Sequence, residues 1–422
     1  MEKNASNYRW QILALLFFAT TINYIDRQVI GMLKPFIAGD LGWSEAGYGY
    51  IVTGFQVAYA IGLLVSGRLL DKIGTKIGYS VAVVVWSLAG MAHAAARSVF
   101  SFGVARFFLG LGESANFPAA VKTVAEWFPQ KERAFATGLF NSGSNIGAIT
   151  APVIVTSITV AYGWEWAFII TGSLGFIWVL FWLLFYKLPN SDIKDVNTKV
   201  NITSEESEEK QSARPMSWKE IFAYKQTIAI CLSRFVTDWV WWFFLFWTPD
   251  YLNKVYGVNL SEMILPLIII YSVAGFGGIG GGWLSGFFIR KGKSIDYSRK
   301  TSILICALIV LPIIAISKIS NIWIVTGFIS FATAAHQGWA SNIFTIVSDI
   351  FPGNAVGSVI GLSGFAGAVG GALAATFIGF VLEITNDYFY IFLIAGLMYL
   401  TAWAILKVLI PEIRPLKING RN

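Results

Sequence analysis

Long apolar stretches separated by short polar connections run through almost the whole of this 422-residue chain. A helix needs about 20 mostly apolar residues to cross a bilayer, and twelve stretches approach that length. They begin near Trp10, Glu45, Lys76, Ser98, Ala134, Trp164, Gln226, Met263, Thr301, Asn321, Ala355 and Tyr388. The first stretch continues past Asp26 without a small-residue cleavage site, so we interpret it as a spanning helix and not as a removed signal peptide. The pattern predicts an all-α membrane protein with twelve transmembrane helices.

The segment 190–225 interrupts this pattern because it is polar, charged and rich in serine. Such a composition cannot bury enough apolar surface to order itself in a core. We therefore expect a six-helix bundle over 1–189, a cytoplasmic linker over 190–225 and a second six-helix bundle over 226–422.

The two predicted halves share a repeat. Glu126, Phe128, Pro129, Gly138 and Gly147 match Asp349, Phe351, Pro352, Gly361 and Gly370 at one constant offset, and Gly67 and Leu69 recur as Gly282 and Leu284. Chance agreement among residues that are common in membranes is the weaker explanation. Two parallel repeats indicate pseudo-symmetric bundles with a ligand site at their interface near mid-membrane.

Composition strengthens the membrane interpretation. Charged residues make up 13% of the chain and hydrophobic residues 56%, whereas a soluble domain carries roughly 25% charge. These values argue against a soluble enzyme, a nucleic-acid binder and a disordered chain. Cys231 and Cys306 lie in apolar runs without metal-ligand partners at usable spacing, so we expect no disulfide framework, no metal site and no cofactor.

The placement of basic residues predicts the orientation. If the N-terminus is cytoplasmic, most of the 31 Lys and Arg residues fall in the even-numbered connections, the linker and the two termini. The opposite side then holds Lys34, Arg97, Lys254 and Lys318. Positive charge concentrates on the cytoplasmic side of membrane proteins, so both termini are expected to be cytoplasmic.

Six charged residues lie inside the predicted spans. They are Asp26 and Arg27 in the first span, Arg106 and Glu113 in the fourth, and Arg234 and Asp238 in the seventh. A charge near the bilayer centre costs at least about 2.5–3.5 kcal/mol, so each must be paired or face water. The set is neutral when fully ionised, and an entering monovalent anion would be balanced by one added proton. This balance favours joint movement of an anion and a proton, while purely structural ion pairs are the alternative, above all for Arg234 and Asp238.

Residue chemistry suggests roles within this set. The planar fork of arginine matches both oxygens of a carboxylate, and a carboxylate in a dry cavity binds a proton more readily than in water. Asp26 and Glu113 are therefore candidates for proton coupling. Polar and aromatic residues that could line a cavity are Asn23, Tyr24, Gln56, Tyr59, Asn116, Asn141, Ser144, Asn145, Trp241, Trp242, His336, Gln337, Trp339 and Asn342. Amides, hydroxyls and indole faces suit a polyol, although interhelical hydrogen bonding explains any single member equally well.

The loop GRLLDKIGTK, Gly67 to Lys76, resembles the signature between helices 2 and 3 of major facilitator superfamily transporters, usually G-x-L-x-D-R-x-G-R-R. Lys72 and Thr75 replace two arginines of that signature, and the second-half copy has Gly286 where an acid would stand. The resemblance implies the superfamily's fold of two six-helix bundles. It also implies a cytoplasmic gating role for Asp71 and Lys72.

More specific stretches resemble the anion:cation symporter family. They are NYIDR from Asn23, RFFLGLGESANFPA from Arg106 and EWFPQKERAFATGLFNSGSNIGA from Glu126. AAHQGWASNIFTIVSDIFP from Ala334 and KVYGVNL from Lys254 are similar to bacterial hexuronate transporters. The resemblance implies that Asp26 and Glu113 respond to protons, that Arg27 contacts the substrate carboxylate and that Arg106 tunes Glu113. Some relatives lack the acid at the position of Asp26, which makes Glu113 the more secure assignment.

The resulting expectation is a symporter in the bacterial inner membrane, not an enzyme, that imports a sugar acid such as glucuronate or galacturonate with protons. We expect a monomer in the bilayer that binds no nucleic acid. The expected substrate-binding residues are Arg27, Tyr24, Tyr59, Arg106, Asn141, Ser144, Trp242, His336, Gln337 and Asn342. Another aldonate or carboxylate symporter, an organic-anion or phosphate-ester antiporter using Arg27 and Arg234, and a transporter-like sensor remain alternatives. The sugar epimer, the proton stoichiometry and the use of H⁺ or Na⁺ stay open.

Overall fold

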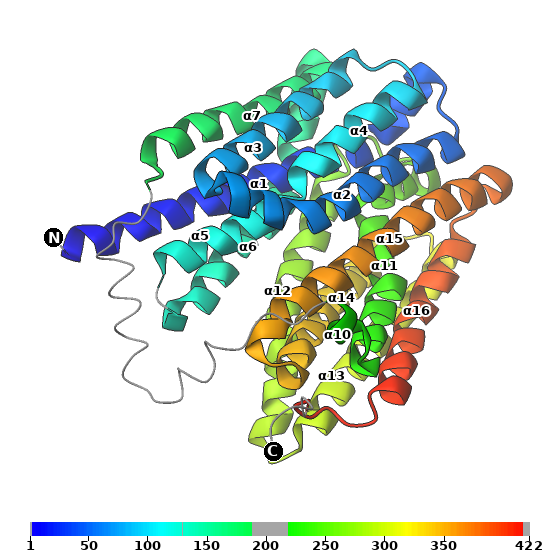
Figure 1. Cartoon of the computed structure of the whole chain (residues 1–422). Coiled ribbons are helices and arrows are strands. Elements are labelled where there is room, and N and C mark those ends of the chain that lie inside the picture. Colours follow the sequence, from blue (N-terminus) through cyan, green and yellow to red (C-terminus); the bar gives the residue numbers. More distant parts are fainter. Residues whose placement is uncertain (1, 129, 188–217, 417–422) are drawn as a thin grey trace. The chain divides into compact units, whose positions relative to one another are not determined.

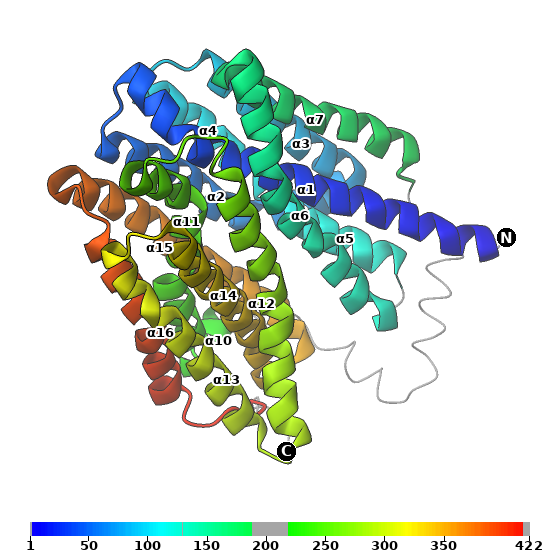
Figure 2. The same ribbon diagram turned by 180° about the vertical axis from the view of Figure 1, so that it is seen from behind.

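The computed structural model describes residues 2–128, 130–187 and 218–416, and these residues form helices joined by short connections (Figures 1 and 2). The first helices are α1 Glu2–Leu41, α2 Glu45–Ile73, α3 Thr75–Ala92, η1 His93–Ala95, α4 Val99–Glu113, α5 Asn116–Trp127, α6 Gln130–Tyr162 and α7 Trp164–Phe185. The later ones are α10 Trp218–Phe222, α11 Lys225–Tyr256, α12 Ile264–Arg290, α13 Ile295–Val310, η2 Leu311–Lys318, α14 Ile322–Ile350, α15 Gly353–Thr385 and α16 Phe389–Leu409. Each predicted apolar stretch coincides with helix, which confirms the all-α fold class.

The predicted linker 190–225 lies mostly outside the described residues, apart from α10 and the first residue of α11. The fourth predicted stretch is divided between α4 and α5. The division of the chain at 190–225 stays a prediction.

Short polar residues and one glycine set the helix ends. The Ser44 hydroxyl accepts a hydrogen bond from the Gly47 amide at the start of α2, and Ser98 and Ser101 form a reciprocal capping box at the start of α4. Such caps satisfy amides that have no partner within the helix. Gly74, with φ of 82°, joins α2 to α3 in a conformation that a side chain would strain. The signature loop therefore forms a tight turn.

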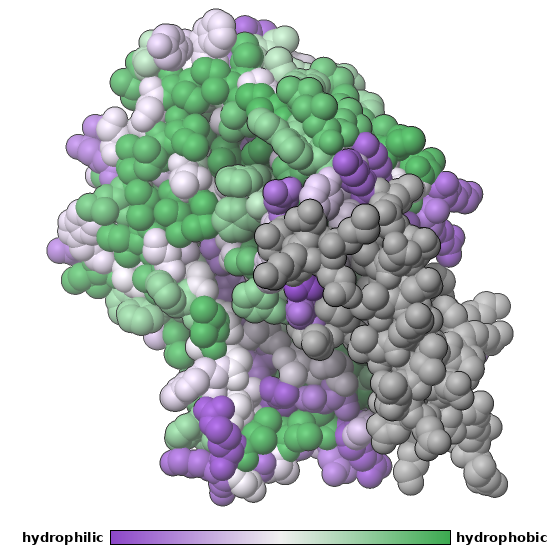
Figure 3. Space-filling view, turned by 90° about the vertical axis from the view of Figure 1, so that its left-hand side faces the viewer, coloured by the Kyte–Doolittle hydropathy of each residue, from purple (hydrophilic) through white to green (hydrophobic). Residues whose placement is uncertain are grey.

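Nine helical segments of the described part are long and apolar enough to cross a bilayer. Segments centred on α1, α4 with α5, and α14 are not among them, and these carry many of the buried charged and polar side chains, including Arg27, Glu113 and His336. Large apolar side chains are exposed along the helices, such as Phe100 at 81% and Ile279 at 73%, and Figure 3 shows a broad hydrophobic surface on the face it presents. The chain is a multi-pass membrane protein.

The described residues group into two compact units. The first unit comprises the described residues within Met1–Glu208, Leu245–Ile268 and Ala375–Glu383, and the second comprises those within Glu209–Phe244, Ile269–Ala374 and Ile384–Asn422. Within the first unit α1 packs on α6, α2 on α4 and α3 on α7, and within the second α13 packs on α14 and α16. The last turns of α11 and part of α15 thus belong to the first unit, although these helices begin in the second.

Close backbone contact between α12 and α14 holds the second unit together. A Cβ atom added at Gly281 would lie 2.3 Å from the Cα of Gly338, and one at Gly277 would lie 2.0 Å from the carbonyl oxygen of Ala334. Small residues let helix backbones approach closely in lipid. The neighbouring Gly280 has nothing within 4 Å of its Cβ position.

These two glycines give a matched stability test. Gly281→Ala is expected to lower the apparent melting temperature of the detergent-purified protein by several degrees, because overpacking a tight contact costs about 1–3 kcal/mol. Gly280→Ala is expected to leave it unchanged or to raise it slightly, because alanine favours the helix by up to about 1 kcal/mol. Equal melting temperatures for the two variants would show that the α12–α14 contact is not tight.

Candidate functional site

A buried ion pair joins α1 to the end of α4 in the first unit. The Nε atom of Arg27 donates to Oε2 of Glu113 at 2.8 Å, and its Nη2 atom forms an ion pair with the same oxygen at 2.7 Å. The two side chains are 3% and 0% exposed. Arg27 also donates to the Asn23 side chain, one turn earlier in α1, at 3.1 Å. The predicted anion-binding arginine and the predicted proton-coupling glutamate are therefore direct partners.

Aromatic rings surround the Arg27 guanidinium. Its central carbon lies 4.8 Å from the ring centre of Tyr24, 5.0 Å from that of Tyr59 and 5.3 Å from that of Phe55. A guanidinium is attracted to aromatic faces at such distances, and the attraction grows when water is excluded. Tyr24 and Tyr59 thus lie beside Arg27, and their contact with a substrate stays a prediction.

Arg106 supports this pair from α4. Its Nη2 atom donates to the backbone carbonyl of Arg27 at 3.0 Å, and its guanidinium lies 5.4 Å from the Phe55 ring and 5.5 Å from the Phe246 ring. Its Nε and Nη1 atoms are buried without a hydrogen-bond partner among the described residues. The hydrogen bond of Arg106 thus holds the α1 backbone, and its tuning of Glu113 stays a prediction.

Asp26 lies next to this pair but makes no ion pair in the described part of the chain. The Asp26 side chain is buried, and neither of its carboxylate oxygens makes a well-formed hydrogen bond with the described residues. The Thr171 hydroxyl lies near this carboxylate. Oε1 of Glu113 and both polar atoms of the Gln56 side chain are likewise buried without a hydrogen-bond partner among the described residues. Buried polar atoms normally have partners, and a role of these groups in binding a solute or a proton stays a prediction.

The predicted charges of α11 form a local pair in the second unit. Arg234 contacts Oδ2 of Asp238 through Nε at 2.9 Å and through Nη2 at 2.7 Å. Its Nη1 atom donates to the Ser363 hydroxyl at 3.2 Å, and its guanidinium lies 5.2 Å from the Phe344 ring. Arg234 and Asp238 thus form an ion pair within one helix, and the choice between a structural and a functional role stays open.

His336 is held between two aromatic residues of the second unit. Its Nδ1 atom lies 2.6 Å from the Tyr399 hydroxyl, and its ring stacks on Trp241 with centroids 5.4 Å apart. The Asn342 amide donates to the carbonyls of Gly281 and Gly338, both at 2.9 Å. Both side chains therefore have structural partners, and their contact with a substrate stays a prediction.

The other predicted binding residues differ in exposure. Ser144 is buried and donates to the Asn141 carbonyl of its own helix at 2.7 Å, whereas the Asn141 side chain is exposed. Trp242 and Gln337 are half-buried in the second unit. Substrate contact by these four residues stays a prediction.

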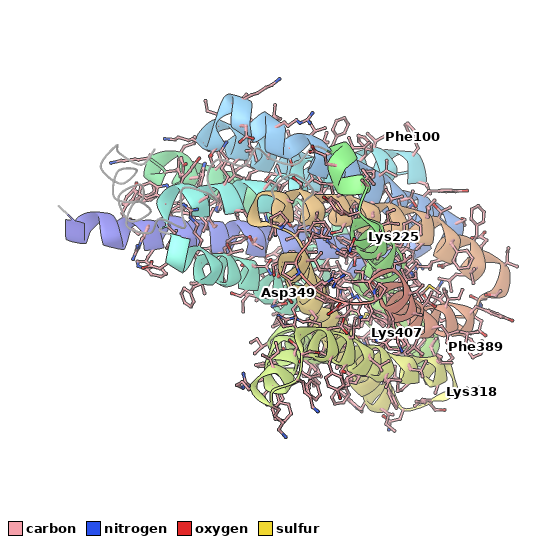
Figure 4. All side chains as sticks on the ribbon, turned by 60° about the horizontal axis from the view of Figure 1, so that its bottom comes forward. Phe100, Lys225, Lys318, Asp349, Phe389 and Lys407 are labelled. Carbon is pink, nitrogen blue, oxygen red and sulfur yellow. The ribbon has the colours of Figure 1, made fainter. Side chains whose placement is uncertain are left out.

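The signature loop has partners that sequence reasoning missed. Asp71 pairs with Lys122 of α5 at 2.7 Å, while Lys72 is exposed. Nearby, Glu126 accepts hydrogen bonds from Thr75 at 2.8 Å and from Tyr186 at 2.6 Å. Burial and the adjacent Glu126 raise the pKa of the Tyr186 phenol, which keeps it a donor. The repeat carries a counterpart, because Asp349, labelled in Figure 4, accepts from Arg299 at 2.9 Å.

Sequence reasoning also misplaced Lys34. It was expected in a polar connection, but α1 continues to Leu41, and Lys34 is 1% exposed and 2.5 Å from Asp250 of α11. Both residues stand in apolar surroundings, GMLKPFI and FWTPDYL. A single charged residue within an apolar run was the feature of the sequence that could have identified Lys34 and Asp250 as buried.

Comparisons with known proteins agree with this fold. Residues 16–375 match the family model described as Major Facilitator Superfamily. The hexuronate transporter of Escherichia coli (strain K12) is 35% identical over 375 residues, covering 88% of this chain and 87% of that protein. The galacturonate transporter of Dickeya chrysanthemi is 35% identical over 308 residues, covering 72% and 89%.

A solved structure of a D-xylose-proton symporter aligns with a TM-score of 0.76 at 15% identity, covering 95% of this chain and 98% of that one, and it supports the fold alone. The family match covers most of the described helices, and the members compared are transporters and not enzymes. The chain therefore belongs to the major facilitator superfamily of membrane transporters.

Proposed function

We propose that this protein is a symporter that imports a sugar-acid anion with protons across the bacterial inner membrane, with a hexuronate as the first substrate candidate. The named relatives support the substrate class. The observation that carries the proposal is the buried Arg27–Glu113 pair, because a solute carboxylate could take the place that the Glu113 carboxylate occupies on Arg27. In the same proposal, the protein works as a monomer with both termini in the cytoplasm.

Charge balance links the two movements. Asp26, Arg27, Arg106 and Glu113 are neutral together when all are ionised, and all four are buried. A sugar-acid anion that binds Arg27 adds one negative charge to a dry site, where unpaired charge is costly. A proton on Glu113 removes that excess and releases Arg27 for the substrate. The anion and the proton then move together while the two bundles alternate access to the site.

Recognition of the sugar uses different groups. The Arg27 fork binds the carboxylate, and the Tyr24 and Tyr59 rings offer apolar faces beside it. We assign the hydroxyl groups of the sugar to the polar residues predicted for the cavity. These are Asn141, Ser144, Trp242, His336, Gln337 and Asn342.

A phosphate-ester antiporter is the alternative, and the structure gives it less support. Such a protein needs cationic groups free to bind a dianion. Here Arg27 is paired with Glu113 and Arg234 with Asp238. Each arginine thus has a carboxylate that competes with the substrate, which suits release of a monoanion linked to a proton.

A proteoliposome uptake panel tests the proposal. Labelled glucuronate and galacturonate are compared with galactonate, a hexose phosphate and uncharged glucose, with and without an inward proton gradient. We expect at least about tenfold faster uptake of a hexuronate than of glucose, a difference of about 1.4 kcal/mol in transition-state binding. The gradient should drive accumulation and a protonophore should abolish it. Accumulation driven by Na⁺ alone, or transport of the hexose phosphate in preference to the uronates, would contradict the proposal.

A further inference from the structure

A groove in the first unit shares no residue with the proposed substrate site. It runs between α3 and α4 and has a volume of about 520 Å³. Three buried alanines, Ala89, Ala96 and Ala105, form its floor. Ser101 is the one polar residue among the described residues that line it. We name it the α3–α4 groove, and the proposed mechanism gives it no role.

The walls of the α3–α4 groove face the hydrocarbon of the bilayer. Leu88 on α3 and Val104 and Phe108 on α4 line the groove, and all three are exposed. Phe100, labelled in Figure 4, is exposed one turn before Val104 and extends the same apolar ridge. Because the chain crosses a bilayer, exposed apolar side chains on its helices contact lipid. An apolar cavity does not hold water, so the occupant that suits this groove is an alkyl chain.

The length of the groove matches one leaflet of a bilayer. Its lining begins at Val85 in α3 and reaches Ala96, just after η1. At about 1.5 Å per residue, this stretch of helix is roughly 17 Å long. The hydrocarbon core of a bilayer is about 30 Å thick, so one leaflet contributes about 15 Å. The groove therefore has the length of a single acyl chain, and it ends at the α3–α4 connection, where the headgroup of that lipid would lie.

Two charges of opposite sign lie at this end of the groove. Nη1 of Arg97 donates to the carbonyl of Ala96, a lining residue, at 2.8 Å and to that of Ala94 at 2.7 Å. Nη2 of Arg97 lies 3.6 Å from Oε1 of Glu165, in the first turn of α7. The Arg97 and Glu165 side chains are 56% and 37% exposed. Both charges are therefore accessible to a further partner.

Aromatic side chains indicate that these two charges lie at headgroup depth. The Trp164 ring centre is 5.3 Å from the Arg97 guanidinium. Tyr162 at the end of α6 and Trp166 near the start of α7 are exposed. Tyrosine and tryptophan concentrate where a bilayer meets water. A phosphate group at this level can thus reach Arg97 while its acyl chain lies in the groove.

We propose that the α3–α4 groove binds one molecule of phosphatidylethanolamine. One acyl chain fills the groove, the phosphate accepts hydrogen bonds from Arg97, and the ammonium group donates to Glu165. This headgroup carries two opposite charges side by side, as Arg97 and Glu165 do, and hydrogen bonds between ionised groups are the strong ones. Phosphatidylglycerol offers no cation to Glu165, and the quaternary ammonium of phosphatidylcholine has no N–H to donate. The bound lipid thus contacts α3, α4 and α7 at one end of the first unit.

A comparison of three lipids tests the headgroup assignment. The delipidated, detergent-purified full chain is titrated with phosphatidylethanolamine, phosphatidylglycerol or phosphatidylcholine of identical acyl chains, and bound lipid is counted by native mass spectrometry. We expect one phosphatidylethanolamine molecule to bind at least about tenfold more tightly than either of the other lipids. Equal affinities for the three lipids, or tighter binding of phosphatidylglycerol or phosphatidylcholine, would overturn the proposal.

Filling the groove tests the location of the lipid. Ala92→Phe places a large side chain in the groove, because Ala92 lines it and is exposed. Val81→Phe is the matched control, since Val81 is exposed on the same helix, one turn beyond Val85 at the inner end of the groove. The affinity for phosphatidylethanolamine should fall at least about tenfold in Ala92→Phe and stay within about twofold of the parent in Val81→Phe. Parent-like affinity in Ala92→Phe, or an equal loss in both variants, would contradict the proposed site.

The two charges are tested in the same titration. Arg97→Gln should lower the affinity for phosphatidylethanolamine by about tenfold, because the phosphate loses its cation. Glu165→Gln should remove most of the preference over phosphatidylglycerol, because the ammonium group loses its carboxylate. Arg414→Gln removes an exposed arginine that pairs with Glu412 outside the groove, so its lipid affinities should equal those of the parent. An unchanged preference in Glu165→Gln would refute the headgroup assignment.

Photo-cross-linking keeps the test decisive if a variant does not fold. Phosphatidylethanolamine with a diazirine in its acyl chain, bound to the parent protein, should label α3 and α4 between Val85 and Phe108. Labelling confined to other helices would overturn the proposal. None of these measurements uses a sugar acid, so their outcome does not depend on the proposed transport function. Because the groove shares no residue with the Arg27 site, substrate affinity in detergent should be the same with and without the lipid.

Discussion

Arg27→Ala is expected to abolish substrate binding. A charged hydrogen bond contributes about 1.5–3 kcal/mol, and the Arg27 fork is expected to give two of them to the sugar-acid carboxylate. Affinity for glucuronate or galacturonate should therefore fall by at least about 100-fold, since each 1.4 kcal/mol is a factor of ten. The measurement is calorimetric binding to the detergent-purified protein, with counterflow in proteoliposomes as a second readout.

Two variants control this result. Arg27→Lys keeps the charge but loses the planar fork, so it should bind more weakly than the parent and more tightly than Arg27→Ala. Arg97→Ala removes an arginine that is largely exposed and pairs with Glu165, so its affinity should equal that of the parent. Because Arg27→Ala leaves Glu113 buried without its partner, monodispersity on size exclusion must be confirmed. Parent-like affinity in folded Arg27→Ala would remove Arg27 from the site.

Glu113→Gln is expected to uncouple transport from the proton gradient. The amide keeps the shape of the side chain but cannot exchange a proton, and it no longer holds Arg27 as an ion pair. Counterflow of labelled hexuronate should continue within about twofold of the parent, whereas accumulation driven by a pH gradient should fall to the diffusion level. Uptake time courses with and without the gradient measure both effects in one preparation.

The same variant separates symport from antiport. An anion exchanger needs no titrating group at this position. If the protein is an antiporter, the parent and Glu113→Gln should therefore both show only exchange that does not depend on the proton gradient. Asp26→Asn is the companion variant, because Asp26 makes no ion pair in the described residues and its loss leaves the Arg27–Glu113 contact intact. Persistent proton-driven accumulation in Glu113→Gln would show that Glu113 is not the residue that couples transport to the proton gradient.

Much of the fold could be predicted from residue order because lipid imposes a simple rule. A segment in the hydrocarbon must satisfy its own backbone, so a long apolar run is a helix. Runs such as that beginning at Trp164 therefore appear as helices at the expected positions. The same rule identified Arg27, Arg106 and Glu113 as candidate functional residues, because a charge in the hydrocarbon is unfavourable unless it is paired or faces water.

The sequence could not predict which charged residues on different helices form ion pairs. Arg27 and Glu113 are 86 residues apart, and Lys34 and Asp250 are 216 apart. Which charged side chains come into contact depends on the rotation and packing of each helix, and neither can be read from a local sequence pattern. Arg106 illustrates the point: the sequence places it in the same predicted span as Glu113, whereas its hydrogen bond goes to the backbone carbonyl of Arg27 in α1.

The all-helical fold class and the presence of charges within the apolar runs were thus determined by the sequence by itself, because each follows from hydropathy along a single segment. Only the tertiary structure decided that Glu113 forms an ion pair with Arg27 and that Lys34, buried, forms one with Asp250 of α11. The physical reason is that electrostatic energy depends on distance in space and on exclusion of water, and both are set by the packing of helices far apart in the chain.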